Sequence, residues 1–188
     1  MTVKTDVSRF HIHDELTAPD GSARLIKSIE AAGGQVSKFV GVIAGSPALF
    51  RAYARMRSEL RSGILAEGTR LRISLAVAER RGDGYSLAQH AALARRFGVG
   101  LDEISLARSF RSTDEREAAL LSLLDAALKG DGKPPQHLVE ETREAGWSDE
   151  EILEALGHLA LNELQSLIAN VAGLPQDQGE APMLASAA

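Results

Sequence analysis

The chain has 188 residues, of which 44% are hydrophobic, 25% charged and only 4% aromatic, and its formal net charge is −5. This length suits one domain with a sizeable core, while the acidic charge and the lack of a basic stripe argue against a nucleic-acid partner. No apolar run is long enough for a membrane span or a signal peptide, and the absence of cysteine excludes disulfides, thiolate metal sites and a cysteine nucleophile, so we expect a cytoplasmic protein.

Helix signals recur along the chain, and no segment has the alternation that is typical of a strand. Residues 1–20 are expected to be an irregular lead-in, and residues 21–174 a single helical domain. An apolar segment covers 36–44, and helices are predicted at about 22–33, 47–63, 67–80, 85–97, 101–110, 113–128, 137–145 and 152–172. The Gly-, Pro-, Ala- and Gln-rich tail, 175–188, is predicted to be disordered. The fold class is therefore all-α, with about seven to eight helices.

Three of these helices begin with a recognisable capping signal. Ser46 precedes Pro47, which suits an N-cap followed by proline at the first helical position. Asp83 is placed to cap the helix that contains Tyr85. Ser148, followed three residues later by Glu151, forms a capping box ahead of the last helix.

Three stretches of sequence, taken in order, resemble one known family. They are F-V-G-V-I-A-G-S-P-A-L-F-R-A-Y at 39–53, L-R-I-S-L-A-V-A-E-R-R-G-D-G-Y-S-L-A-Q-H-A-A-L-A-R at 71–95, and A-G-W-S-D-E-E-I-L-E, A-L-N-E-L and A-N-V-A-G between 145 and 173. They are similar to the opening segment, the active-site helix pair and the last helix of the alkylhydroperoxidase D/carboxymuconolactone decarboxylase family. The resemblance spans most of 36–173 and implies the helical bundle of that family.

The resemblance also shows which reactive groups are missing. In the peroxidase members, a glutamate and a histidine move protons to and from two cysteines. The glutamate position falls on Leu71, the cysteine positions fall on Asp83 and Ser86, and only the histidine is kept, as His90. Aspartate and serine cannot form the sulfenic acid or disulfide of a thiol cycle, so that reaction is excluded.

The candidate catalytic residues are His90, Tyr85, Ser86 and Asp83. Helical spacing places Asp83, Ser86 and His90 on one face, where a neutral imidazole could act as a general acid or base. Structural roles are equally open: a buried, hydrogen-bonded histidine, a packing tyrosine, a first-turn serine and a capping aspartate.

Two functions follow from the resemblance. The first is a cysteine-independent, decarboxylase-like enzyme that uses acid–base chemistry on a small acidic organic substrate, in which Glu67 or Glu79 would replace the acid missing at Leu71. The second is a non-catalytic, oligomeric binding or scaffold protein that kept the fold.

The expected partners are other copies of the same chain and a small-molecule ligand. The resemblance implies a homo-oligomer, as a dimer, trimer or hexamer, in which buried polar residues of the last helix, such as His158 and Asn162, pair across subunits. No cofactor is expected, and no metal, because the histidines are scattered along the chain. Neither nucleic acid nor a membrane is an expected partner.

Overall fold

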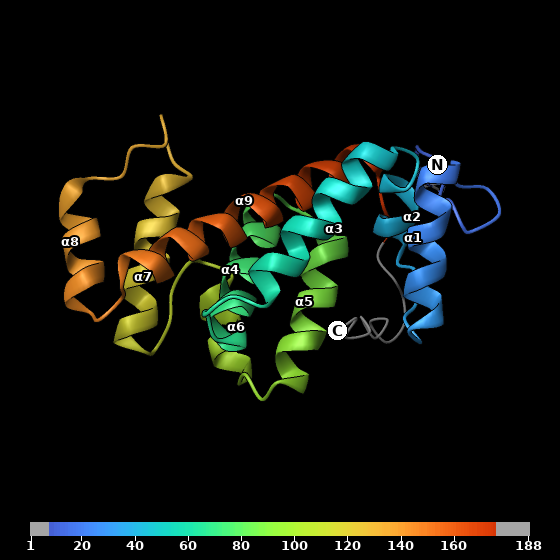
Figure 1. Ribbon diagram of the computed structural model, residues 1–188. Coiled ribbons are helices and arrows are strands. Elements are labelled where there is room, and N and C mark those ends of the chain that lie inside the picture. The colour runs from blue at the N-terminus through green and yellow to red at the C-terminus, as the bar shows by residue number, and fades with distance from the viewer. Residues whose placement is uncertain (1–7, 176–188) are drawn as a thin grey trace.

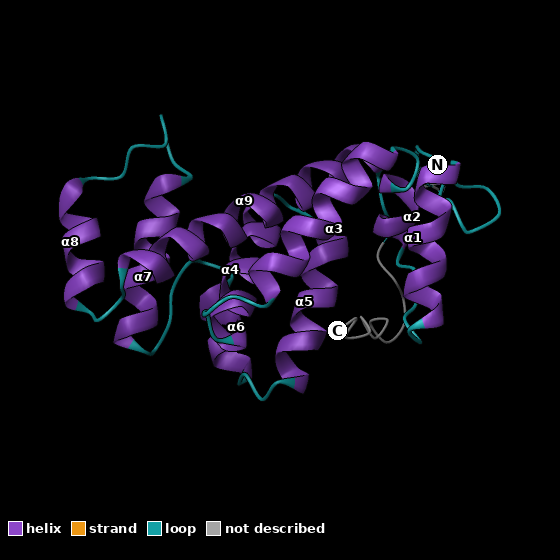
Figure 2. Ribbon diagram, viewed as in Figure 1, coloured by secondary structure: helices purple, strands orange, loops and turns teal. Residues whose placement is uncertain are grey.

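The computed structural model describes residues 8–175, so most of the predicted disordered tail lies outside it, as do residues 1–7. Within 8–175 all regular structure is helical, which confirms the predicted all-α class (Figure 2). Nine helices are present, and eight of them have seven residues or more. The helices are α1 (Asp20–Ala31), α2 (Lys38–Ile43), α3 (Pro47–Arg61), α4 (Glu67–Arg80), α5 (Gly84–Arg96), α6 (Leu101–Ala107), α7 (Glu115–Ala127), α8 (Gln136–Glu144) and α9 (Asp149–Ala172).

The longest helix, α9, connects the two ends of the molecule. It has 24 residues, which corresponds to a length of about 36 Å. In Figure 1 it runs from α7 and α8 at one end to α1 and α2 at the other. Along this path it packs against α2, α3, α4, α5 and α7. The long helix therefore reaches nearly every layer of the fold.

The helix at the centre of the fold is α4. Residues 73–78 are all buried, because α5, α6 and α9 pack around this helix. A helix that is buried on all sides needs small and apolar residues around its circumference, and α4 provides them with Ile73, Leu75, Ala76 and Val77. As a result, α5 and α9 both pack against α4 and also contact each other.

The predicted capping signals are present in the structure. The Ser46 hydroxyl accepts a hydrogen bond from the backbone N–H of Leu49, and Pro47 is at the first helical position. Ser148 and Glu151 form the reciprocal capping box at the start of α9. These side chains satisfy backbone N–H groups that a helix leaves without partners in its first turn.

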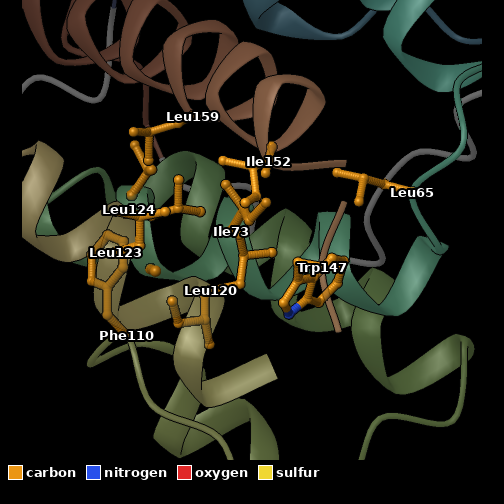
Figure 3. Close-up of a cluster of buried hydrophobic side chains, with 13 residues drawn as sticks. Leu65, Ile73, Phe110, Leu120, Leu123, Leu124, Trp147, Ile152 and Leu159 are labelled. Atoms are coloured by element: carbon orange, nitrogen blue, oxygen red, sulfur yellow. The ribbon is translucent and has the colours of Figure 1, made fainter. Parts of the chain in front are cut away.

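One hydrophobic cluster lies where α4, α7 and the first half of α9 meet (Figure 3). Ile73, Leu120 and Leu124 are fully buried there. Trp147 also belongs to the cluster, and its indole Nε1–H donates to the carbonyl of Arg116 at 2.6 Å. The guanidinium of Arg116 lies over the indole ring, 3.6 Å from its centroid, a favourable cation–π geometry.

A second cluster lies toward the other end of α9 and includes the buried Ile26, Phe39 and Phe50. Leu161 and Ala169 of α9 belong to this second cluster. No helix within the described range is long and apolar enough to cross a membrane.

The residues before α1 are held against α2 and α9 by backbone hydrogen bonds. The N–H of Arg9 donates to the carbonyl of Ala172 at 2.7 Å, and the N–H of His13 donates to the carbonyl of Gly41 at 3.0 Å. Gly173 ends α9 in the left-handed conformation, with φ of 63°, which glycine adopts without strain. The described part of the lead-in is therefore attached to the end of the last helix.

Candidate functional site

A cavity of about 410 Å³ lies between α3, α4, α5 and α9, and the start of α2 contributes to its wall. Its apolar wall consists of Phe39, Val40, Leu71, Leu93, Phe97 and Leu161. The remaining lining residues are polar or charged: Ser37, Tyr53, Arg57, Arg61, Glu67, Arg70, Ser74, Gln89, His90, Arg96, His158, Asn162 and Gln165. This size and mixed lining suit a small organic molecule with polar groups.

Of the four predicted catalytic residues, His90 lines this cavity. Its side chain is half-buried, and its Nε2 atom is buried without a hydrogen-bond partner. Burial, together with the positive charge of Arg57, lowers the pKa of His90 to about 4. The imidazole is therefore neutral at neutral pH and has a nitrogen free to donate or accept a hydrogen bond.

The other three predicted residues lie at the N-terminal end of α5, outside the cavity lining. Asp83 caps the helix as predicted, accepting a hydrogen bond from the N–H of Ser86 at 3.0 Å. The buried hydroxyl of Tyr85 accepts from the N–H of Phe39 at 3.3 Å. In the described part of the chain, no side-chain hydrogen bond joins Asp83, Tyr85 or Ser86 to His90.

The hydroxyl of Ser86 takes part in a hydrogen-bond chain across three helices. Tyr53 in α3 donates to Oε1 of Gln165 at 2.8 Å, and Nε2 of Gln165 donates to the Ser86 hydroxyl at 3.0 Å. Burial raises the pKa of Tyr53 to about 12, so its hydroxyl stays protonated and remains a donor. The chain fixes the orientation of the Gln165 amide beside the cavity.

The cavity carries an excess of positive charge. Four arginines line it, and Glu67 is the one carboxylate among the lining residues. Glu67 is already paired with Arg70, with 2.5 Å between Oε2 and Nη2. The side chains of Arg57, Arg61 and Arg96 have no hydrogen bond or ion pair with any residue in the range 8–175. Such unpaired guanidinium groups are the usual ligands of carboxylates and phosphates.

Three buried nitrogen atoms in the cavity lining lack hydrogen-bond partners: Nε2 of His90, Nε2 of Gln89 and Nε of Arg70. The amide and guanidinium nitrogens are obligate donors, and the imidazole nitrogen is a donor in one tautomer. Buried polar groups are normally satisfied, and water or a bound molecule that accepts hydrogen bonds would satisfy these atoms.

Two polar residues of α9 have hydrogen-bond partners within their own chain, and their expected pairing across subunits stays a prediction. Nε2–H of His158 donates to the carbonyl of Leu60 within the same chain at 3.2 Å, and Asn162 donates to the carbonyl of His158 at 2.8 Å. Burial is the main cause that lowers the pKa of His158. The sequence did contain a signal for this face, because His158, Asn162 and Gln165 recur at helical spacing among apolar residues.

The two acids considered as replacements at Leu71 occupy different places. Glu67 lines the cavity one turn before Leu71. Glu79 instead pairs with Arg108, with 2.9 Å between Oε2 and Nη2. Among the described residues, no group of three or more histidine, aspartate or glutamate side chains is arranged to hold a metal ion.

The carboxymuconolactone decarboxylase family model matches residues 47–129, from the start of α3 to just beyond α7. This family region includes His90 and the first turn of α5, and it supplies three of the four helices that surround the cavity. No curated protein matches the sequence.

Several solved structures share the fold. An alkylhydroperoxidase AhpD core described as an uncharacterized peroxidase-related protein from Ralstonia eutropha has 21% identity and a TM-score of 0.76, covering 93% of this chain and 95% of its own. An uncharacterized peroxidase-related protein from Silicibacter has 16% identity and a TM-score of 0.79, covering 95% and 97%. A protein of unknown function from Agrobacterium tumefaciens has 23% identity and a TM-score of 0.67, covering 73% and 96%. These likenesses establish the alkylhydroperoxidase D-like fold, and the chemistry must be argued from the residues of this chain.

Proposed function

We propose that the cavity binds a small acidic organic molecule and that His90 exchanges a proton with it. The observation that carries the proposal is the group of three buried, unpartnered nitrogens, on His90, Gln89 and Arg70, that line one cavity. The unpaired Arg57 and Arg96 add positive charge to the same space. An anionic, acceptor-rich molecule with an apolar body satisfies all of these features together.

The proposed chemistry is acid–base catalysis without a thiol. No cysteine is present in the 188 residues, so the peroxidase-related names of the similar structures do not transfer to this chain. An imidazole can give a proton to a bound substrate or take one from it, and can reverse the transfer in a later step. In this proposal Glu67 holds Arg70, and the protein is a cysteine-independent, decarboxylase-like enzyme.

Tyr85, Ser86 and Asp83 have a positioning role in the proposal. Each is buried and uses its side chain to hold the first turn of α5. His90 is one helical turn beyond Ser86, so the orientation of this turn sets the direction of the imidazole. The role predicts that substitutions here change the rate of turnover more than the affinity for the ligand.

A binding screen tests the proposal. Small carboxylates should raise the melting temperature, and the corresponding neutral amides should not, because guanidinium groups select for charge. Arg57→Gln should weaken carboxylate binding by about tenfold or more. Arg55→Gln is the matched control, since Arg55 is on the same helix but is exposed and paired with Glu59.

Turnover separates an enzyme from a binding protein. Once a carboxylate that binds has been identified, His90→Gln should retain most of the affinity and lose turnover, because glutamine keeps a donor but cannot exchange a proton at neutral pH. Equal stabilisation by carboxylates and amides, or no stabilisation by either, would contradict the proposed function.

A second candidate function is that of an oligomeric scaffold. It is favoured by an apolar groove of about 570 Å³ beside the C-terminal end of α9. Phe10, Leu167 and Val171 line this groove, and about half or more of each side chain is exposed. We propose that a second copy of the chain covers this surface. Light scattering should give a multiple of 20.1 kDa, and Leu167→Glu should lower the mass toward the monomer.

A further inference from the structure

We propose that an anion entering the cavity brings a proton onto His90, so that anion binding and proton uptake occur together. This inference rests on the proposed function, because it requires the cavity to accept an anion. It adds that the substrate itself converts His90 from a base into an acid.

The protein groups around His90 disfavour its protonated form. Its Nε2 is buried and has no acceptor nearby, so a proton added there would lack a hydrogen-bond partner. The guanidinium of Arg57 also acts on the ring electrostatically. Burial and this neighbouring charge both disfavour the imidazolium form, which agrees with a pKa of about 4.

The charged groups around the cavity also affect the protonation of His90. Its titratable or charged side chains are Tyr53, Arg57 and Arg61 from α3, Glu67 and Arg70 from α4, Arg96 from α5, and His158 from α9. The residues that α2 contributes are uncharged, and α6, which also packs on α5, contributes none. Since the Glu67 carboxylate is already paired with Arg70, no carboxylate of the lining is free to support a proton on His90.

A bound anion would change both features of the surroundings of His90. It supplies the acceptor that Nε2–H lacks, and its negative charge offsets the guanidinium of Arg57. Both changes favour the protonated form of His90. This linkage is reciprocal. If a bound anion raises the proton affinity of His90, protonation of His90 raises the affinity of the cavity for the anion by the same factor. Anion affinity should therefore increase as the pH falls from neutrality toward about 5.

The coupling determines when an acid is present in the cavity. A free enzyme with a neutral His90 has no acid in the cavity near neutral pH, whereas the complex has an imidazolium beside the bound molecule. A proton is then available only after the substrate has entered. Such an arrangement keeps acid catalysis coupled to occupancy of the site.

The experiment uses benzenesulfonate and sulfate as probes, because both keep a constant charge over the pH range and cannot take up the proton themselves. Titration calorimetry at about pH 5.5, in two buffers of different ionisation enthalpy, gives the number of protons bound per anion. For the wild-type protein we expect the number of protons bound per anion to approach about one. The affinity for the anion should fall by up to about tenfold for each pH unit as the pH is raised above about 5.5.

Two variants and one spectrum complete the test. His90→Gln should still bind the probe but with no proton uptake and a flat pH profile, whereas His137→Gln, at an exposed histidine of α8 outside the cavity lining, should behave like the wild type. If His90→Gln does not fold, NMR of the His90 ring in the wild-type protein replaces it, and its titration midpoint should rise when benzenesulfonate is added.

The outcomes separate this inference from the proposed function. Binding without proton uptake, or uptake that persists in His90→Gln, overturns the coupling but leaves the anion site intact. Failure of every anion to bind, including small carboxylates, overturns the proposed function and the coupling with it.

Discussion

The amide of Gln165 in α9 donates a hydrogen bond of 3.0 Å to the hydroxyl of Ser86 in α5. Ser86 occupies the position where the resembled peroxidases have their second cysteine. In this chain the side chain at that position joins two helices, and the same glutamine accepts a hydrogen bond from Tyr53. The position that has a redox-active cysteine in the resembled peroxidases is thus occupied in this chain by a serine that makes a structural hydrogen bond.

Removing this hydroxyl should lower stability. Ser86→Ala leaves the Nε2 group of Gln165 without its acceptor, so the free energy of unfolding should fall by about 1–3 kcal/mol. Urea denaturation followed by circular dichroism measures the change. Ser122→Ala, at an exposed serine of α7, is the control and should change the value by less than about 0.5 kcal/mol.

The cap at Asp83 should contribute a similar amount. Asp83→Ala removes the acceptor for the N–H of Ser86 and should cost about 1–2 kcal/mol, while Asp83→Asn, which keeps an oxygen at the same place, should cost less. Thermal melts of the two variants provide the comparison. Equal losses in both would show that the negative charge, rather than the cap, is what stabilises α5.

The pKa of His90 should make stability depend on pH. Between about pH 6.5 and about pH 4 the unfolded chain binds a proton at His90 that the native protein, with a pKa of about 4, does not bind. Stability from this residue is therefore full above about pH 6.5 and is lost as the pH falls toward 4, by about 3 kcal/mol in all. Denaturation of the wild type and His90→Gln at several pH values isolates the effect, and parallel curves would contradict it.

The loop between α3 and α4 should depend on Glu154. Its two carboxylate oxygens accept the backbone N–H groups of Ile64 and Leu65, each at 2.9 Å. Glu154→Ala removes both acceptors and should cost about 1.5–3 kcal/mol, since hydrogen bonds to a charged group are the stronger ones. Hydrogen exchange at these two amides should become faster, and Glu141→Ala, an exposed residue of α8, should leave it unchanged.

Local features of the fold could be predicted from the sequence because they depend on residues close together in the chain. The caps at Ser46, Asp83 and Ser148 each involve a backbone N–H three residues ahead, so short-range spacing is sufficient. Even so, the six-residue α2 was anticipated only as an apolar segment, since so short a helix gives less than two turns of periodicity.

The cavity depends on long-range contacts and was only partly predictable. His90 was identified from the resemblance, but Arg57, Gln165 and His158 enter the site from α3 and α9, far away in sequence. Their helical spacing shows which residues share a face, yet it does not tell which helix that face meets. For the same reason, the in-chain acceptor of His158, the carbonyl of Leu60, could not be inferred.

The path of α9 through both hydrophobic clusters determines how the domain unfolds. Ile152 and Leu159 belong to the cluster around Trp147, while Leu161 belongs to the cluster around Phe39. If either cluster loses its packing, part of α9 becomes exposed. The other cluster packs against the same helix and is destabilised with it. The domain should consequently melt in a single cooperative calorimetric transition, with equal van't Hoff and calorimetric enthalpies. The cavity, whose wall shares Phe39, Tyr53 and Leu161 with the second cluster, should keep its shape up to the temperature at which the whole chain unfolds.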